Sequence, residues 1–147
     1  MFREGLIKEQ TAEKNRSQDL DMPELKRLSK KHLAHLAKRL DELEDLMRKT
    51  IKSDPELEHR YKLLTSITGI GPIATVRLMA HMPELGEISA SKIASLAGLA
   101  PITQQSGKWS GKARIGGGRA IVRHALYMPA VSAIRFNKDL KAFYQRL

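Results

Sequence analysis

The chain has 147 residues with 26 basic and 16 acidic side chains, which gives a formal net charge of +10. It has no cysteine, so disulfides, a thiolate nucleophile and cysteine-ligated zinc are excluded, and a reducing, cytoplasmic location is expected. The N-terminus lacks the apolar run of a signal sequence and no later segment is suited to span a bilayer, so we expect no membrane partner.

The basic excess lies at one end of the chain. Residues 101–147 carry nine Lys or Arg and one acidic residue. Residues 1–60 carry 14 Lys or Arg and 13 acidic residues, so their charges nearly balance. A confined basic surface is typical of a protein that contacts nucleic acid. A membrane surface is the alternative, but it favours a long amphipathic helix with a basic face, and the most basic segment here is rich in glycine. We therefore predict DNA as the partner.

Residues 1–54 are predicted to form a coiled-coil-like helical arm. Within it, residues 23–52 carry apolar side chains spaced alternately three and four apart, at Leu33, Leu36, Leu40, Leu43 and Met47. This seam of two heptads favours a homo-oligomer formed through the helix, and the alternative is a helix that lies on its own domain. His32 and His35 could share a metal, but no third ligand is near, so we predict solvated histidines and no metal site.

A compact helical domain is predicted to follow over residues 55–147, incomplete at its C-terminus. Its first helix has Ser53 and Glu56 at the spacing of a capping box, and Pro55 suits an early helical position.

This helix would end at a short glycine turn, Gly69 to Gly71, before a second helix that begins at Pro72. Two helices joined in this way form a helix-hairpin-helix pattern, in which N–H groups at the second N-terminus face a phosphate. The alternative is an ordinary helical hairpin whose glycines serve only the turn.

The later elements are also predicted to be helices. One over residues 91–97 would have Ser89 as N-cap and end at Gly98. Another begins near Arg119, and the last begins near Asp139 without a capping signal. Since no segment shows a strand pattern, the expected fold class is all-α, with the helical arm followed by the compact helical domain.

A basic, glycine-rich loop lies between these helices, with the sequence QSGKWSGKARIGGGRAIVR over residues 105–123. Glycine allows close approach, so the loop can surround a phosphate with N–H groups, cations and a hydroxyl. Ser106 is a candidate nucleophile, and the alternative is a turn serine in a basic loop. The predicted DNA-phosphate ligands, with the hairpin glycines included, are Gly69, Gly71, Lys108, Lys112, Arg114, Gly116, Gly117, Gly118, Arg119 and Arg123.

Taken together, these segments resemble a known family. LLTSITGIGP, HMPELG, IASLAGLAP, QSGKWSGKARIGGGR, VRHALYM and RFNKDLKAFYQRL occur in the order found in the C-terminal domain of the IS-one-ten, or Piv, insertion-sequence transposases. TAEKNR, at residues 11–16, resembles the family's lead into a coiled-coil linker. The better-studied members of this family are recombinases guided by a bridge RNA.

The resemblance implies a transposase that cuts and rejoins DNA. In complete members a RuvC-like domain with four acidic residues holds magnesium, and the domain resembled here supplies a serine nucleophile that forms a covalent phosphoserine intermediate. Ser106 matches that serine. A guide RNA is a further partner that the resemblance implies.

The sequence departs from the family pattern in two ways that bear on the activity we expect. Gln105 stands where the family often has an acidic residue. We also expect the RuvC-like domain and the final helices to be missing, so that this chain holds no cofactor itself and is inactive alone. The alternative function is a non-enzymatic, sequence-indifferent DNA-binding module. An RNA-binding or dimerisation unit is a third hypothesis, which scarce aromatic residues disfavour.

Overall fold

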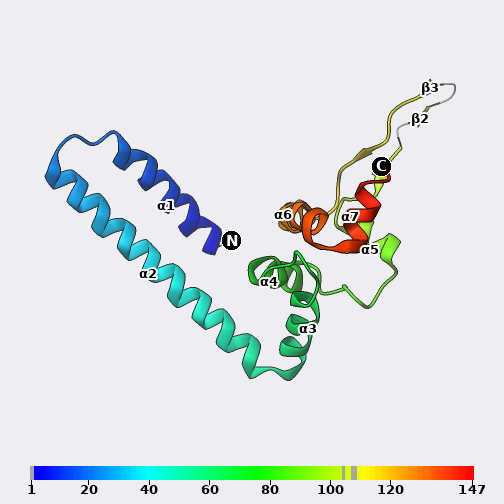
Figure 1. Cartoon of the computed structure of the whole chain (residues 1–147), viewed down its shortest axis with the longest axis horizontal. Coiled ribbons are helices and arrows are strands. Elements are labelled where there is room, and N and C mark those ends of the chain that lie inside the picture. Colours follow the sequence, from blue (N-terminus) through cyan, green and yellow to red (C-terminus); the bar gives the residue numbers. More distant parts are fainter. Residues whose placement is uncertain (1, 104, 107–108) are drawn as a thin grey trace. The chain divides into compact units, whose positions relative to one another are not determined.

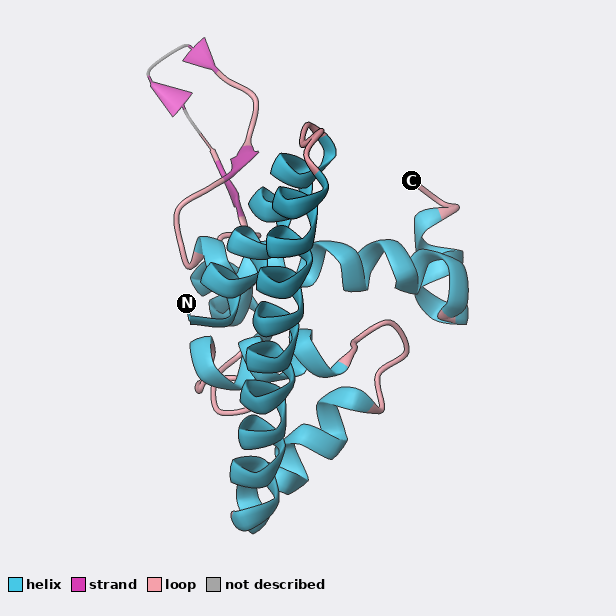
Figure 2. Cartoon of the chain, turned by 90° about the vertical axis from the view of Figure 1, so that its left-hand side faces the viewer, coloured by secondary structure: helices cyan, strands magenta, loops and turns pink. Residues whose placement is uncertain are grey.

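The computed structural model describes residues 2–103, 105–106 and 109–147. The all-α prediction is confirmed, because seven helices make up most of this part of the chain and its four strands have two residues each (Figure 1, Figure 2). The chain divides into two compact units, Met1–Pro55 and Glu56–Leu147. Within the described ranges, no helix is both long and apolar enough to cross a membrane.

The first unit is an antiparallel helical hairpin. Helix α1 (Phe2–Gln18) and helix α2 (Pro23–Ser53) run in opposite directions, since Arg3 near the start of α1 pairs with Glu44 in the second half of α2 at 2.8 Å. Leu36 of the predicted seam is buried, so the seam packs within the chain. Sequence analysis missed α1 as a separate helix, because its few apolar side chains form no sustained stripe.

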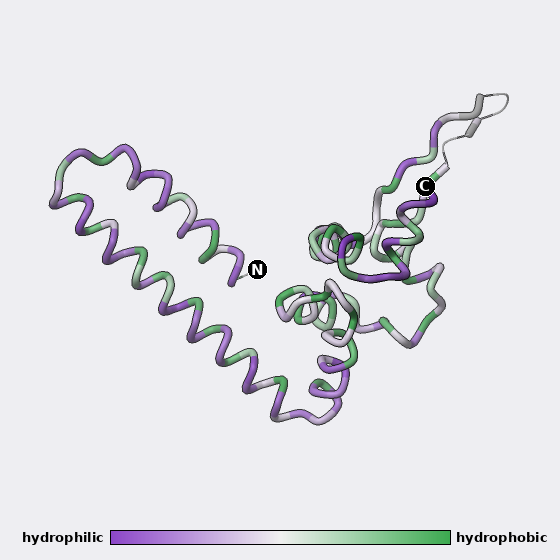
Figure 3. The backbone as a smooth tube through the Cα atoms, in the orientation of Figure 1, coloured by the Kyte–Doolittle hydropathy of each residue, from purple (hydrophilic) through white to green (hydrophobic). Residues whose placement is uncertain are grey.

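The second unit buries its apolar residues between three helices. It contains α3 (Pro55–Thr65), α4 (Pro72–His81), α5 (Ala90–Leu96), α6 (Ala120–Phe136) and α7 (Lys138–Tyr144). Helix α4 packs against α6, and α6 against α7. Hydrophobic residues gather on α4 to α6, whereas hydrophilic residues run along the whole of α1 and α2 (Figure 3). The buried cluster that joins α4, α5 and α6 consists of Leu78, Met82, Ala97 and Val122.

Two predicted helix ends were wrong. Ser53 does not cap α3: it is the last residue of α2, and its hydroxyl donates to the Thr50 carbonyl at 2.9 Å. The last helix does have a cap, since Asn137 Oδ1 accepts the N–H groups of Asp139 and Leu140 at 3.1 Å each. Asparagine caps satisfy N–H groups that have no partner inside the helix, so α7 begins one residue earlier than predicted.

The prediction of no strands was also wrong, because part of the glycine-rich loop is a two-stranded ribbon. Strand β1 (Pro101–Ile102) pairs antiparallel with β4 (Arg114–Ile115), and β2 (Gln105–Ser106) with β3 (Trp109–Ser110). Two residues separate β1 from β2 along the sequence, and three separate β3 from β4. Pairs this short leave no alternating pattern to detect.

Three helix ends meet where this ribbon, residues 101–115, joins the helices. The backbone N–H of Arg119, at the start of α6, donates to the carbonyl of Leu96 at the end of α5 at 2.6 Å. Its Nη1 donates to the carbonyl of His81 at the end of α4 at 3.0 Å. Both Nη atoms also donate to the Glu84 carboxylate, at 2.6 Å each. We call this arrangement the junction.

The pairing with Arg119 strongly lowers the pKa of the Glu84 carboxyl group. Its hydrogen bonds from the Arg119 side chain, with a smaller contribution from a backbone N–H, lower its pKa from 4.5 to about 2. The same bond raises the pKa of Arg119. Two parallel N–H···O bonds between a guanidinium and a carboxylate fix geometry as well as charge, so the pair holds the loop after α4 to the start of α6.

Close backbone contact completes the junction. Gly98, Gly117 and Gly118 have φ angles of +68°, +60° and +55°, a region that side chains disfavour. A Cβ atom on Gly118 would lie 2.7 Å from the Cα of Gly98 and would also overlap the Leu96 carbonyl. Glycine is therefore required here for packing against the end of α5.

We predict that the Glu84 carboxylate makes stability depend on pH. Because its folded pKa lies below 4.5, its contribution is fully present above pH 4.5 and is lost as pH falls toward 2. Thermal unfolding followed by circular dichroism should show that Glu84→Gln flattens the fall in Tm over that window. The control is Glu87→Gln on the same loop, which should keep the wild-type slope. Parallel curves for wild type and Glu84→Gln would contradict the assignment.

We predict that Gly116 and Gly118 differ sharply in how much replacement by alanine destabilises the protein. Gly118→Ala should lower the free energy of unfolding by more than about 1 kcal/mol, because its φ is positive and its Cβ would overlap backbone. Gly116→Ala is the matched control, since nothing lies within 4 Å of its Cβ position. Urea unfolding measures the free energy of unfolding of both variants. Equal losses would show that close backbone packing is not the reason for glycine at position 118.

Candidate functional site

Ser106 lies in β2, near the far end of the ribbon from the helices (Figure 1). It is exposed, and it pairs with Trp109 in the antiparallel register. The serine is therefore presented by an extended two-stranded element. The adjoining site residue Lys108 lies outside the described residues.

Two of the predicted cations belong to the same ribbon. Lys112 lies between β3 and β4, and Arg114 lies in β4 opposite Ile102. Both side chains are exposed, and neither has an ion pair or side-chain hydrogen bond within the part of the chain that the structure describes. Among the described residues, no protein group therefore competes for their donors.

The other two predicted cations bind protein groups at the ribbon's base. Arg119 is held by Glu84 in the junction, with about a third of each side chain exposed. Arg123, one turn further along α6, donates through Nη1 to the carbonyls of Gly117 at 3.0 Å and Gly98 at 3.4 Å. Sequence analysis grouped these arginines with Ser106, whereas their contacts lie in the junction.

Gly116, Gly117 and Gly118 were predicted to lie against a phosphate. Gly117 and Gly118 take part in the close contacts of the junction, and the Gly117 carbonyl accepts from Arg123. Gly116 has open space at its Cβ position. Glu84 and Gly98 are site residues that sequence analysis missed, although Glu84 is one of only three acidic residues after residue 60.

The two hairpin glycines differ in their surroundings. Gly69 has a φ of +104°, and a Cβ there would lie 2.8 Å from the Pro129 carbonyl of α6, so this glycine allows the turn to pack on α6. Gly71 is the N-cap of α4, is exposed and has nothing within 4 Å of its Cβ position. Because the first N–H groups of a helix have no partner inside the helix, the start of α4 next to Gly71 stays the predicted anion-binding position of the hairpin.

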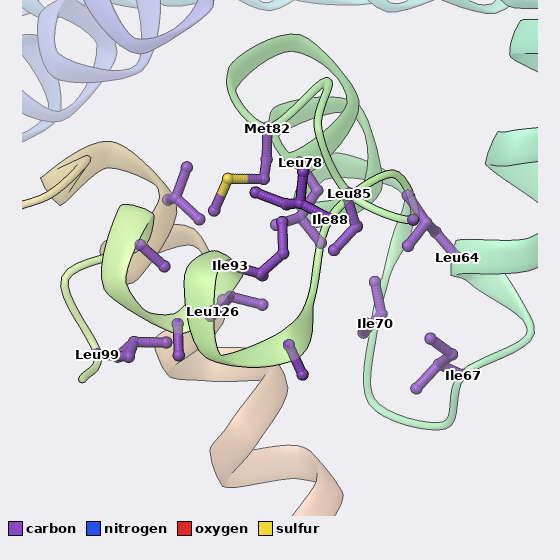
Figure 4. Close-up of a pocket in the computed structure, with 15 residues that line it drawn as sticks. Leu64, Ile67, Ile70, Leu78, Met82, Leu85, Ile88, Ile93, Leu99 and Leu126 are labelled. Carbon is purple, nitrogen blue, oxygen red and sulfur yellow. The ribbon is translucent and has the colours of Figure 1, made fainter.

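An apolar pocket of about 500 Å³ lies beside the core of the second unit (Figure 4). Leu64, Leu78, Leu85 and Ile93 are among the side chains that line it, and they come from α3, α4, α5 and the loop before α5. No charged residue lines it, so it offers no group for phosphate chemistry.

A metal site is not apparent in the described ranges, where no group of three or more His, Asp or Glu side chains could hold an ion. His32, one of the two histidines considered above, lies 3.6 Å from Glu9 across the helical hairpin. His124 is the histidine nearest in sequence to the ribbon, and it is exposed on α6.

Comparisons with known proteins match the part of the sequence that contains this site. The model of the Transposase IS116/IS110/IS902 family matches residues 61–145, from within α3 to the end of α7. A pilin gene-inverting protein of Moraxella bovis is 36% identical over 103 residues, which are 68% of this chain and 32% of that protein. The pilin gene-inverting protein of Moraxella lacunata is 35% identical over 103 residues, with the same coverage of both chains.

The chain spans about a third of the length of these two relatives. The family's match includes the hairpin glycines, the ribbon, the junction and α7. Because it extends over more than half of the sequence, the chain belongs to the Transposase IS116/IS110/IS902 family.

Proposed function

We propose that this chain carries the DNA-contacting and serine-nucleophile portion of a transposase that cuts and rejoins DNA. The observation that carries the proposal is the exposed Ser106 near the end of a basic ribbon, in a member of a transposase family. The names of the two relatives, which invert a gene, support a recombination reaction for this chain.

The ribbon suits a DNA duplex in shape and in charge. A two-stranded β-ribbon fits the major groove of B-DNA. Lys112, between β3 and β4, and Arg114, in β4, are both exposed, and they would neutralise phosphates of the duplex. Since such contacts supply charge rather than base readout, binding should be weak, indifferent to sequence and strongly dependent on salt.

The proposed reaction is a phosphoryl transfer. The Ser106 oxygen forms a bond to phosphorus as the bond from phosphorus to a sugar oxygen breaks. The serine proton passes to a base, and the departing oxygen takes up a proton. A later attack by a DNA hydroxyl on the phosphoserine releases the enzyme, so no phosphodiester energy is lost. The nearby cations would balance charge on the pentavalent phosphate.

The proposed reaction also needs groups that activate Ser106 and stabilise the departing oxygen. In the complete members that this chain resembles, a RuvC-like domain holds magnesium, and we propose that such a domain would supply the metal here. A guide RNA and self-association through α2 are further proposals. For self-association, α2 offers exposed Leu25, Leu28 and Leu46 in addition to the seam that packs in the hairpin.

A second candidate function is a non-enzymatic DNA-binding module. It is favoured by the same lack of a metal-binding cluster in the described ranges, since phosphodiester attack needs an activated oxygen and a stabilised leaving group. The two functions share the ribbon and its cations, and they differ in whether Ser106 becomes linked to DNA.

We predict that Ser106 becomes covalently attached to one DNA end when the chain is combined with a RuvC-like domain from a close relative, with guide RNA if required. Ser106→Ala should abolish the adduct while DNA affinity stays nearly unchanged, because one hydroxyl adds little to contacts made by charge. Denaturing gels and peptide mapping would detect the linkage. Ser110→Ala is the matched control: it pairs with Gln105 rather than with Ser106, and it should keep the adduct.

An adduct that maps to Ser110, or that persists in Ser106→Ala, would overturn the nucleophile assignment. Absence of an adduct in every variant, with DNA binding intact, would leave the non-enzymatic module as the function.

We predict that Lys112 and Arg114 each contact a phosphate. Replacing either by alanine should make the slope of log affinity against log salt shallower by about 0.9, the value for one phosphate on duplex DNA. Fluorescence anisotropy with a labelled duplex over a series of salt concentrations measures the slope. Lys92→Ala, which removes an exposed lysine of α5, is the control and should leave the slope unchanged. Equal effects at all three positions would mean that binding reflects net charge alone.

A further inference from the structure

The two ends of the ribbon leave the helical body at the same place. The outgoing strand begins three residues after Gly98, and the returning strand ends one residue before Gly116. The backbones at Gly98 and Gly118 are in such close contact that neither position has room for a Cβ atom. We call the segments 98–100 and 116–118 the root of the ribbon.

Arg123 links the two halves of this root. Its Nη1 donates to the Gly98 carbonyl at 3.4 Å, on the outgoing side, and to the Gly117 carbonyl at 3.0 Å, on the returning side. The side chain is half-buried and comes from the second turn of α6. One guanidinium on a rigid helix therefore holds both chain segments from which the ribbon extends.

We propose that Arg123 is a positioning residue that fixes the direction of the ribbon through its two root carbonyls, and that it is not a DNA-phosphate ligand. This inference rests on the proposed function only for the role of the serine that the ribbon carries. It revises the expectation that placed Arg123 with the phosphate ligands, since Nη1 already donates to both root carbonyls and the side chain is half-buried.

The length of the ribbon means that the position of Ser106 depends on the orientation of the chain at the root. Ser106 lies eight positions after Gly98 in the sequence, and at about 3.3 Å per residue a fully extended chain of that length would span at most roughly 26 Å. A rotation of about 5° at the root would then move the serine by roughly 2 Å, and a misplacement of about 1 Å can reduce a reaction rate about 100-fold.

The test measures the ribbon's direction in the full chain. Because the protein has no cysteine, nitroxide labels can be attached at engineered cysteines alone. Ala113→Cys on the ribbon and Ser91→Cys on α5, both exposed, report the ribbon against the body. Ser66→Cys with Ser91→Cys reports the body alone. Distances come from pulsed electron-spin resonance, and each variant is first checked for helical content and cooperative unfolding.

Arg123→Ala should at least double the width of the ribbon-to-body distance distribution and leave the body distribution unchanged. The salt slope of duplex binding should change by less than about 0.3, since no phosphate contact is lost. Arg135→Ala, an exposed arginine on the same helix, is the matched control and should not widen the ribbon distribution. If Arg123→Ala does not fold, Arg123→Lys keeps the charge and should still widen the ribbon distribution, with an unchanged slope.

An unwidened ribbon distribution in both Arg123 variants would overturn the proposal. So would a salt slope made shallower by about 0.9 in Arg123→Ala, because that is the signature of a phosphate ligand. Neither readout depends on an adduct, so a failure of Ser106 as nucleophile is distinguished from a failure of Arg123 as positioning residue. In the reconstituted reaction, Arg123→Ala should slow adduct formation at unchanged DNA affinity.

Discussion

Arg119 and its partners form the contact on which the arrangement of the second unit depends. Helix ends leave backbone groups without partners inside the helix, and these groups must be satisfied elsewhere. The backbone N–H of Arg119 binds the Leu96 carbonyl at the end of α5, and its side chain binds the His81 carbonyl at the end of α4. Glu84 balances its charge. One residue thus joins α4, α5 and α6 next to the buried cluster around Met82 and Val122.

The basic residues near the ribbon fall into two groups, one that binds protein groups in the junction and one that is exposed to solvent. Arg119 and Arg123 bind carboxylate and carbonyl groups of the protein, while Lys112 and Arg114 extend into solvent from the ribbon. A basic segment can therefore contain two kinds of cation, of which one builds the scaffold and the other is free for a ligand. In the proposed function the first kind holds the ribbon in place and the second kind meets the DNA.

Sequence predicted those parts of the fold that local rules control. Pro72 begins α4, and Gly98 follows α5 with a positive φ, as expected from proline and glycine preferences. Ser89 stands at the predicted N-cap position of α5, but its side chain makes no capping hydrogen bond. The ribbon was missed because its short strand pairs depend on partners across the loop. The ion pair of Arg119 with Glu84 was missed because the two residues lie 35 positions apart, and nothing local marks their contact.

The site was predicted in part. Ser106 was named from its neighbours and from a family resemblance, and the family is confirmed, while the serine's role is still a prediction. Gly116, Gly117 and Gly118 were predicted to allow close approach of a phosphate, and that role is still a prediction. What approaches Gly118, however, is the backbone of Gly98 rather than a ligand, a distinction that depends on tertiary packing. Composition alone does not separate a phosphate loop from a tightly packed turn.

Amide hydrogen exchange with and without duplex DNA tests the central claim most directly, namely that DNA meets the ribbon while the root stays bound to protein. In the free chain, the Arg119 amide should already exchange slowly because of its bond to Leu96. Added DNA should slow exchange over residues 112–115 and leave residues 117–123 unchanged. New protection over 117–123 without any over 112–115 would contradict the account, since it would place the DNA on the end of the root and the start of α6.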